Sequence, residues 1–257
     1  MDELNIDLEE VAEFLLDAAA SRPLAILANF DLIMKKVPAI AQELIVKLKT
    51  GFESREHTDV EILNQLTDIK TNNNPEAANL ISSLRTRAIV NLSDLLMNRI
   101  DFNIASTYSE KSNLVEQAKV FLAECGLKKT LCDVLEYTYA RNPEMHDRLR
   151  GSFGETKGEL PPASPDAVLL ILKELIDDDN FYGASEIILG RNVNEMSLAQ
   201  RKEIAEMIKM LIRDAEYGDT KTFQYYKAGW IDRRELQCFF DEKIEQDALV
   251  VVDFEEE

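Results

Sequence analysis

The chain has 257 residues, of which 46% are hydrophobic and 30% charged, a balance typical of globular proteins and not of disordered ones. The longest apolar run, Val168 to Leu172, is far too short to cross a bilayer. Residues 1–21 hold seven acids and no Lys or Arg, unlike a signal peptide. Three cysteines are too few for a disulfide framework, so we expect a reducing, cytoplasmic location and no membrane contact.

The negative charge is concentrated at the two ends of the chain. The net charge is −19, and residues 1–21 and residues 241–257 each contribute −7, which leaves −5 for residues 22–240. This distribution fits poorly with a DNA mimic, which spreads its charge over a duplex-like surface. Two interpretations stay open: the acids keep the protein soluble and favour helix N-termini, or they bind partners with basic surfaces.

Helix signals begin near the N-terminus. One amphipathic stripe is predicted to contain Leu8, Val11, Phe14 and Leu15. Pro23 stands in a first turn, where its missing N–H costs nothing, and Pro38 opens a further helix. A glycine such as Gly51 is typical of the position just after a helix. The sequence therefore predicts helices over residues 7–20, 23–36 and 38–50.

Capping signals mark the next helices. Thr58 and Glu61 have the spacing of a capping box, and Asn74-Pro75 is an N-cap followed by a first-turn proline. The latter begins the longest predicted helix, residues 75–100. Its inner stripe is expected to be Ala77, Ile81, Leu84, Ala88, Leu92 and Leu95. Its outer face is expected to carry Ser82, Arg85, Arg87, Asn91, Asp94 and Asn98.

The remaining chain continues with helix signals, interrupted once. Further helices are predicted over 109–125, 127–140, 143–150, 165–178, 181–189, 197–211, 220–228 and from 232 onward. Residues 151–165 contain three Gly and three Pro, as a linker or long loop does. The sequence thus predicts an all-α, multi-helix bundle-like fold of about thirteen helices, with an N-terminal domain at 1–150, a linker at 151–165 and a C-terminal domain at 166–257.

Motifs that carry chemistry are missing from the sequence. It has no phosphate-binding loop, no nucleophile elbow, and neither His57 nor His146 stands in a metal-ligand spacing, so each is interpreted as a surface histidine. The acidic run Asp177–Asn180 fits either a site for a hard cation or the cap of the next helix. We expect no enzyme activity, no cofactor and no metal, although a site assembled from scattered carboxylates stays open.

Residues 221–234, KTFQYYKAGWIDRR, interleave aromatic and basic side chains. The candidate binding residues in this aromatic-basic corner are Lys221, Tyr225, Lys227, Trp230, Arg233 and Arg234. Three interpretations remain: a helix–turn–helix corner closed at Gly229, a protein-binding hot spot, or a surface that stacks bases and holds phosphates.

The C-terminal segment DALVVVDFEEE offers a second candidate surface. Val251 and Phe254 are apolar anchors among acids, a pattern typical of a peptide that orders when it binds a partner. The alternative is a segment that folds back on the protein's own body.

Residues 14–49, from FLLDAAASRP to ELIVKLK, resemble the helical hairpin of T-even-type phage terminase small subunits. In that family, a helix that ends in small residues and Ser-Pro precedes a long amphipathic helix. The resemblance covers about one-seventh of the chain, and nothing after residue 50 matches. It implies a phage assembly or packaging role among the alternatives.

The sequence as a whole predicts a non-enzymatic helical adaptor or assembly protein. Its acidic termini and aromatic-basic corner would make protein–protein contacts with partners that have basic surfaces. The alternative is a nucleic-acid-handling oligomer, such as a phage packaging or transcription accessory factor, that uses Arg85, Arg87 and Arg99 together with residues 221–234.

Overall fold

The structure is a computed structural model that describes residues 8–54, 57–69, 74–101, 108–128, 130–142, 163–178, 184, 187 and 199–207. Every regular element in these residues is a helix, which confirms the all-α prediction. The predicted total of about thirteen helices extends over residues outside this set and stays a prediction.

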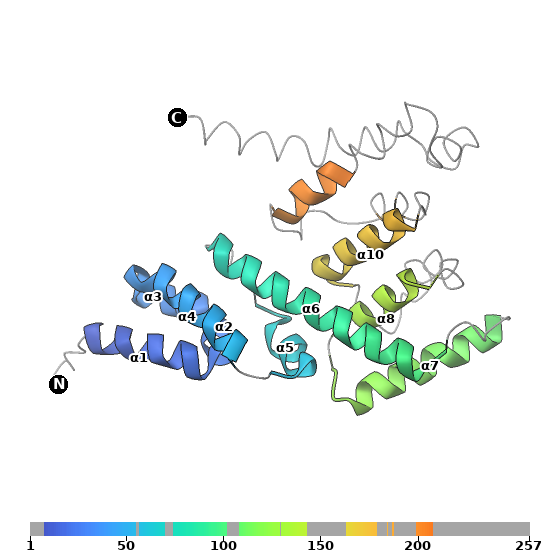
Figure 1. Ribbon diagram of the computed structural model, residues 1–257, viewed down its shortest axis with the longest axis horizontal. Coiled ribbons are helices and arrows are strands. Elements are labelled where there is room, and N and C mark those ends of the chain that lie inside the picture. Colours follow the sequence, from blue (N-terminus) through green and yellow to red (C-terminus); the bar gives the residue numbers. More distant parts are fainter. Residues whose placement is uncertain are drawn as a thin grey trace. The chain divides into compact units, whose positions relative to one another are not determined.

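Figure 1 shows the helices of the described residues. In chain order they are α1 (Leu8–Ser21), α2 (Pro23–Ala28), α3 (Phe30–Lys36), the 3-10 helix η1 (Pro38–Ile40), α4 (Ala41–Ser54), α5 (Asp59–Leu66), α6 (Pro75–Arg99), α7 (Tyr108–Glu124), α8 (Leu131–Ala140) and α10 (Pro165–Asp177). Residues 199–207 are also helical.

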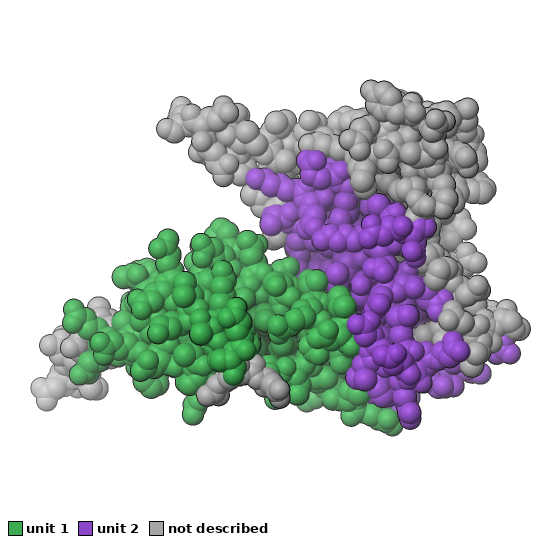
Figure 2. Space-filling model, viewed as in Figure 1, with its two compact units in different colours: residues 1–92, 122–130 green, residues 93–121, 131–257 purple. Residues whose placement is uncertain are grey.

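The chain divides into two compact units (Figure 2). Unit 1 comprises residues 1–92 and 122–130, and unit 2 comprises residues 93–121 and 131–257. The boundaries between the units fall within α6, within α7 and directly before α8. Of the predicted linker at 151–165, residues 151–162 lie outside the described part of the chain, so the linker and the two domains that it separates stay predictions.

Unit 1 is built on helices α1, α2 and α4, which pack against one another, while α5 packs against α2. Their apolar side chains form a core that excludes water, and this burial is the main stabilising contribution. Fully buried members of this core include Leu27, Phe30, Leu44, Ile45, Leu48, Ile62, Leu63 and Leu66.

The helix predicted over residues 23–36 is broken at Asn29. The Asn29 side-chain amide donates to the carbonyl of Ala25 at 2.9 Å. The Asn29 backbone N–H donates instead to the carbonyl of Ile26 at 3.1 Å. The side chain thus takes the acceptor that a continuous helix would give to the backbone. The prediction of one helix here is wrong because local hydrogen bonding by Asn29 divides it into α2 and α3.

Gly51 does not end α4, contrary to the prediction, since the helix continues to Ser54. A Cβ atom added at Gly51 would stand 2.5 Å from the carbonyl oxygen of Ala19 and 3.2 Å from the Cβ of Pro23. The glycine is therefore required by the close approach of α1 and α4, not by the end of a helix.

The caps predicted for α5 and α6 are present. Thr58 and Glu61 form both hydrogen bonds of a capping box, and the bond from the Thr58 backbone lowers the pKa of the Glu61 carboxyl. Asn74 accepts a hydrogen bond from the backbone of Ala77 at 3.0 Å. Local sequence signals therefore determine where both helices begin.

A left-handed turn at Gly126 follows α7. Gly126 has a φ of 92° and the Leu127 N–H bonds to Leu122, which is the geometry of a Schellman motif. The Asn64 side chain donates to the Gly126 carbonyl at 2.8 Å and accepts from the Lys128 N–H at 3.1 Å. One amide therefore links α5 to this turn within unit 1.

Helix α6 buries a wider stripe than predicted. Ile89 and Leu96 belong to the core, whereas Leu95 is 47% exposed. Arg85, which was predicted on the outer face, is buried. The buried face of α6 therefore extends, in i, i+4 steps, onto a side of the helix that the prediction had left exposed.

Unit 2 contains α8, which is buried on every side from Cys132 to Ala140, and α10, which packs against it. The N-cap of α10 is Ser164, as predicted, and accepts from the Ala167 N–H. No helix in the described residues is both long and apolar enough to cross a membrane.

Replacing Gly51 with Ala is expected to lower the free energy of unfolding by about 1–3 kcal/mol, because backbone atoms of α1 must move to admit the methyl group. Urea denaturation measures the change. Thr50→Ala, at an exposed neighbouring position of α4, serves as the control and should change the value by less than about 0.5 kcal/mol. Equal effects of the two substitutions would contradict the proposed close packing at Gly51.

Candidate functional site

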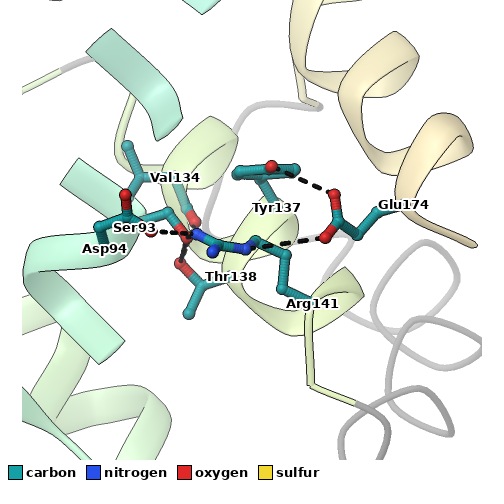
Figure 3. Close-up of polar contacts among 7 residues, drawn as sticks. All are labelled: Ser93, Asp94, Val134, Tyr137, Thr138, Arg141 and Glu174. Carbon is teal, nitrogen blue, oxygen red and sulfur yellow. Dashed lines mark hydrogen bonds and ion pairs between the residues drawn. The ribbon is translucent and has the colours of Figure 1, made fainter. Parts of the chain in front are cut away.

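A polar cluster in unit 2 centres on Arg141, directly after α8 (Figure 3). Its guanidinium pairs with Asp94 of α6 at 2.5 Å and lies 3.8 Å from the carboxylate of Glu174 on α10. It also lies over the ring of Tyr137, 5.5 Å from the centroid. One arginine therefore connects three helices by charge and by a cation–π contact.

The hydroxyls beside Arg141 form a directed chain of hydrogen bonds. The Val134 carbonyl only accepts, so the Thr138 hydroxyl donates to it, at 2.6 Å. Ser93 must then donate to Thr138, at 2.9 Å, which leaves the Ser93 oxygen to accept from Arg141 at 3.4 Å. Ser93 and Thr138 are fully buried, so this chain satisfies hydroxyls that would otherwise lie unpaired in the core.

Tyr137 and Glu174 complete the cluster. The Tyr137 hydroxyl donates to the Glu174 carboxylate at 3.2 Å. Burial, and after it the negative charge of Glu174, raises the pKa of Tyr137 to about 12. Desolvation acts to lower the pKa of Arg141, but the hydrogen bond to Asp94 and the neighbouring charges outweigh it and raise that pKa. Near neutral pH the tyrosine is therefore protonated and the arginine charged.

Buried carboxylates elsewhere in unit 2 are also held by donors. Asp133 of α8 accepts from the Ser164 N–H at 2.7 Å and from its hydroxyl at 2.6 Å. Asp166 of α10 accepts from the amide of Gln200 at 2.7 Å. These bonds offset the cost of removing both carboxylates from water and fix α10 against α8 and residues 199–207.

The chemistry of these clusters is structural. Most of these hydrogen bonds and ion pairs join two helices or cap one, and the raised pKa of Tyr137 keeps its hydroxyl protonated near neutral pH. Among the residues that the structure describes, no group of three or more His, Cys, Asp or Glu side chains is placed to hold a metal ion.

The predicted binding residues fall outside the described part of the chain. These are Lys221, Tyr225, Lys227, Trp230, Arg233 and Arg234 of the aromatic-basic corner, with Val251 and Phe254 of the C-terminal segment. The structure neither brings them together nor separates them, and their roles stay predictions.

Other expectations can be compared with the structure. Asp177 ends α10 and Asp178 is its C-cap, while Asp179 and Asn180 lie outside the described residues, so both interpretations of that acidic run stay predictions. His57 is half-buried, with its ring centroid 5.4 Å from that of Phe52, so the prediction of a plain surface histidine is wrong. Of the arginines in the nucleic-acid alternative, Arg87 and Arg99 are exposed but Arg85 is buried.

Large apolar side chains are exposed on unit 1. Phe14 on α1 is 70% exposed, Leu32 on α3 is 60% exposed and Val46 on α4 is 61% exposed. The helical periodicity predicted that Phe14 lies with Leu8, Val11 and Leu15 on the inward stripe of α1. The structure corrects this for Phe14, because the side that faces α4 centres on Ala19.

Comparisons with models of protein families, with curated proteins and with solved structures found no match to this chain. The resemblance of residues 14–49 to terminase small subunits therefore stays a prediction.

Removing either buried hydroxyl of the cluster should destabilise unit 2. Ser93→Ala and Thr138→Val are each expected to lower the free energy of unfolding by about 1–3 kcal/mol, because the first removes a buried hydrogen bond and the second leaves the buried Ser93 hydroxyl without its acceptor. The double variant should lose less than the sum of the two. Thermal and urea unfolding provide the measurement, with Ser83→Ala on the exposed side of α6 as the control. Strictly additive losses would show that the two hydroxyls do not interact.

Proposed function

We propose that this protein is a non-enzymatic helical adaptor or assembly protein that acts through protein–protein contacts. The observation that carries the proposal is the exposure of Phe14, Leu32 and Val46 on unit 1. Large apolar side chains in water cost free energy that burial against a partner recovers, at about 25 cal/mol per Å². Aromatic side chains such as Phe14 are also enriched where proteins bind one another.

The polar side chains of unit 2 are consistent with this function. Arg141, Tyr137 and Glu174 bind one another and hold helices together. They give unit 2 a defined shape. A defined shape lowers the entropic cost of association, since fewer groups must become ordered when a partner binds.

The acidic termini and the aromatic-basic corner remain part of the proposal. The sequence supports them through its charge distribution and through the mixture of aromatic and basic residues at 221–234. In this account a partner with a basic surface contacts the termini, and the apolar side chains of unit 1 supply further contact area.

The test is affinity purification of the tagged full chain from cells that express it, with mass spectrometry of the proteins retained. Phe14→Ser/Leu32→Ser/Val46→Ser should retain its partners at least about fivefold less than the unaltered chain, because a few anchors dominate most interfaces. Gln42→Ser/Thr50→Ser/Asn79→Ser changes three exposed polar positions of the same unit and is the matched control.

Circular dichroism of each variant establishes that the helices are retained. A chain that ends at residue 247 extends the same experiment to the C-terminal segment. The proposal is wrong if the unaltered chain retains no protein above the untagged background. It is equally wrong if the triple variant and its control retain the same proteins in the same amounts.

A further inference from the structure

Helix α1 presents acidic side chains next to an exposed aromatic one. Glu10, Glu13 and Asp17 are exposed, and Phe14 is 70% exposed. Glu10 and Asp17 lie four residues before and three residues after Phe14, so all three share one side of the helix. Val11 and Leu15 are the apolar residues next to Phe14 on α1, and both are half-buried.

The charges on this face repel one another. Glu10 and Glu13 are spaced i, i+3, and Glu13 and Asp17 are spaced i, i+4, spacings at which like charges destabilise a helix. Residues 8–21 include no Lys or Arg that could offset the repulsion. In the described part of the chain, none of these three carboxylates forms an ion pair. A positively charged partner would relieve the repulsion and cover Phe14 at the same time.

We infer that the α1 face made by Glu10, Glu13, Phe14 and Asp17 docks a basic amphipathic helix of a protein partner. The three acids span about 10 Å along the helix, which matches Lys or Arg side chains one and two turns apart on a second helix. The apolar stripe of that helix covers Phe14. The same acids repel phosphate, so this face selects a basic protein over a nucleic acid or an anionic membrane.

This inference rests on the proposed function and names the chemistry of one partner. The probe is a fluorescein-labelled amphipathic helical peptide of Lys and Leu, with Leu at i, i+3, i+4 and i+7. Its binding to the full chain is measured by fluorescence anisotropy at about 0.15 M salt, where charges more than about 8 Å apart are largely screened. A peptide with Glu in place of Lys and a duplex DNA are the comparison ligands.

Two variants with the same net charge separate this face from the bulk acidity of the chain. Glu10→Gln/Glu13→Gln/Asp17→Asn and Glu43→Gln/Glu53→Gln/Glu76→Gln each remove three exposed acids from unit 1. The α1 variant is expected to bind the peptide at least about tenfold more weakly than the unaltered chain, and the control variant within about twofold of it. Phe14→Ser should also weaken binding about tenfold, since it removes the apolar anchor.

Three results would overturn the inference. These are equal weakening by both charge variants, equal binding of the Glu-containing peptide, and DNA binding that the α1 variant weakens. Failure of the inference is distinct from failure of the proposed function. If Phe14→Ser/Leu32→Ser/Val46→Ser loses its cellular partners while the α1 charge variant retains them, the adaptor function stands and the basic-helix partner does not.

Discussion

Helix α8 is buried on every side, and its buried polar side chains Asp133, Tyr137 and Thr138 are hydrogen-bonded to residues outside the helix. Thr138 and Asp133 are almost fully buried, and Tyr137 and Arg141 place a hydroxyl and a charge beside them. An unpaired group of this kind costs about 1–3 kcal/mol, a large part of the stability of a domain. These partners come from α10, from the end of α6 and from Ser164. Supplying them sets where these parts of the chain lie within unit 2.

Unit 1 is held together differently. Its helices bury leucine, isoleucine and phenylalanine, and the polar contacts that it needs are caps and turns such as those of Thr58 and Asn64. Close packing at Gly51 fixes how α1 approaches α4. The helices that supply this core also expose Phe14 and Val46, so the unit combines a fixed framework with apolar surface. That combination is the physical basis of the proposed adaptor function.

The sequence predicted those features that local chemistry controls. The caps at Thr58, Asn74 and Ser164 were predicted because a side chain and a backbone N–H a few residues away are sufficient to form them. Gly51 was misinterpreted because a glycine that ends a helix and one that admits a second helix look the same in sequence. The Arg141 cluster was missed altogether: Asp94 lies 47 residues away along the chain, and no periodicity indicates such a pair. Arg85 was placed outside for a related reason, since only tertiary packing determines how much of α6 is covered.

The titration of Tyr137 tests most directly the central claim, that the buried Tyr137 of α8 is held by a hydrogen bond to Glu174. The phenol signal can be followed by NMR with 13C-labelled tyrosine and assigned with Tyr137→Phe. Because the folded protein holds the pKa at about 12, above the ordinary value of 10.0, the neutral tyrosine contributes stability that is fully present below pH 10 and is lost as the pH rises through 12. We predict that Tyr137 stays protonated at pH 11, where exposed phenols have ionised, and that Glu174→Gln moves its pKa back toward 10. A Tyr137 pKa near 10 in the unaltered protein would contradict the account.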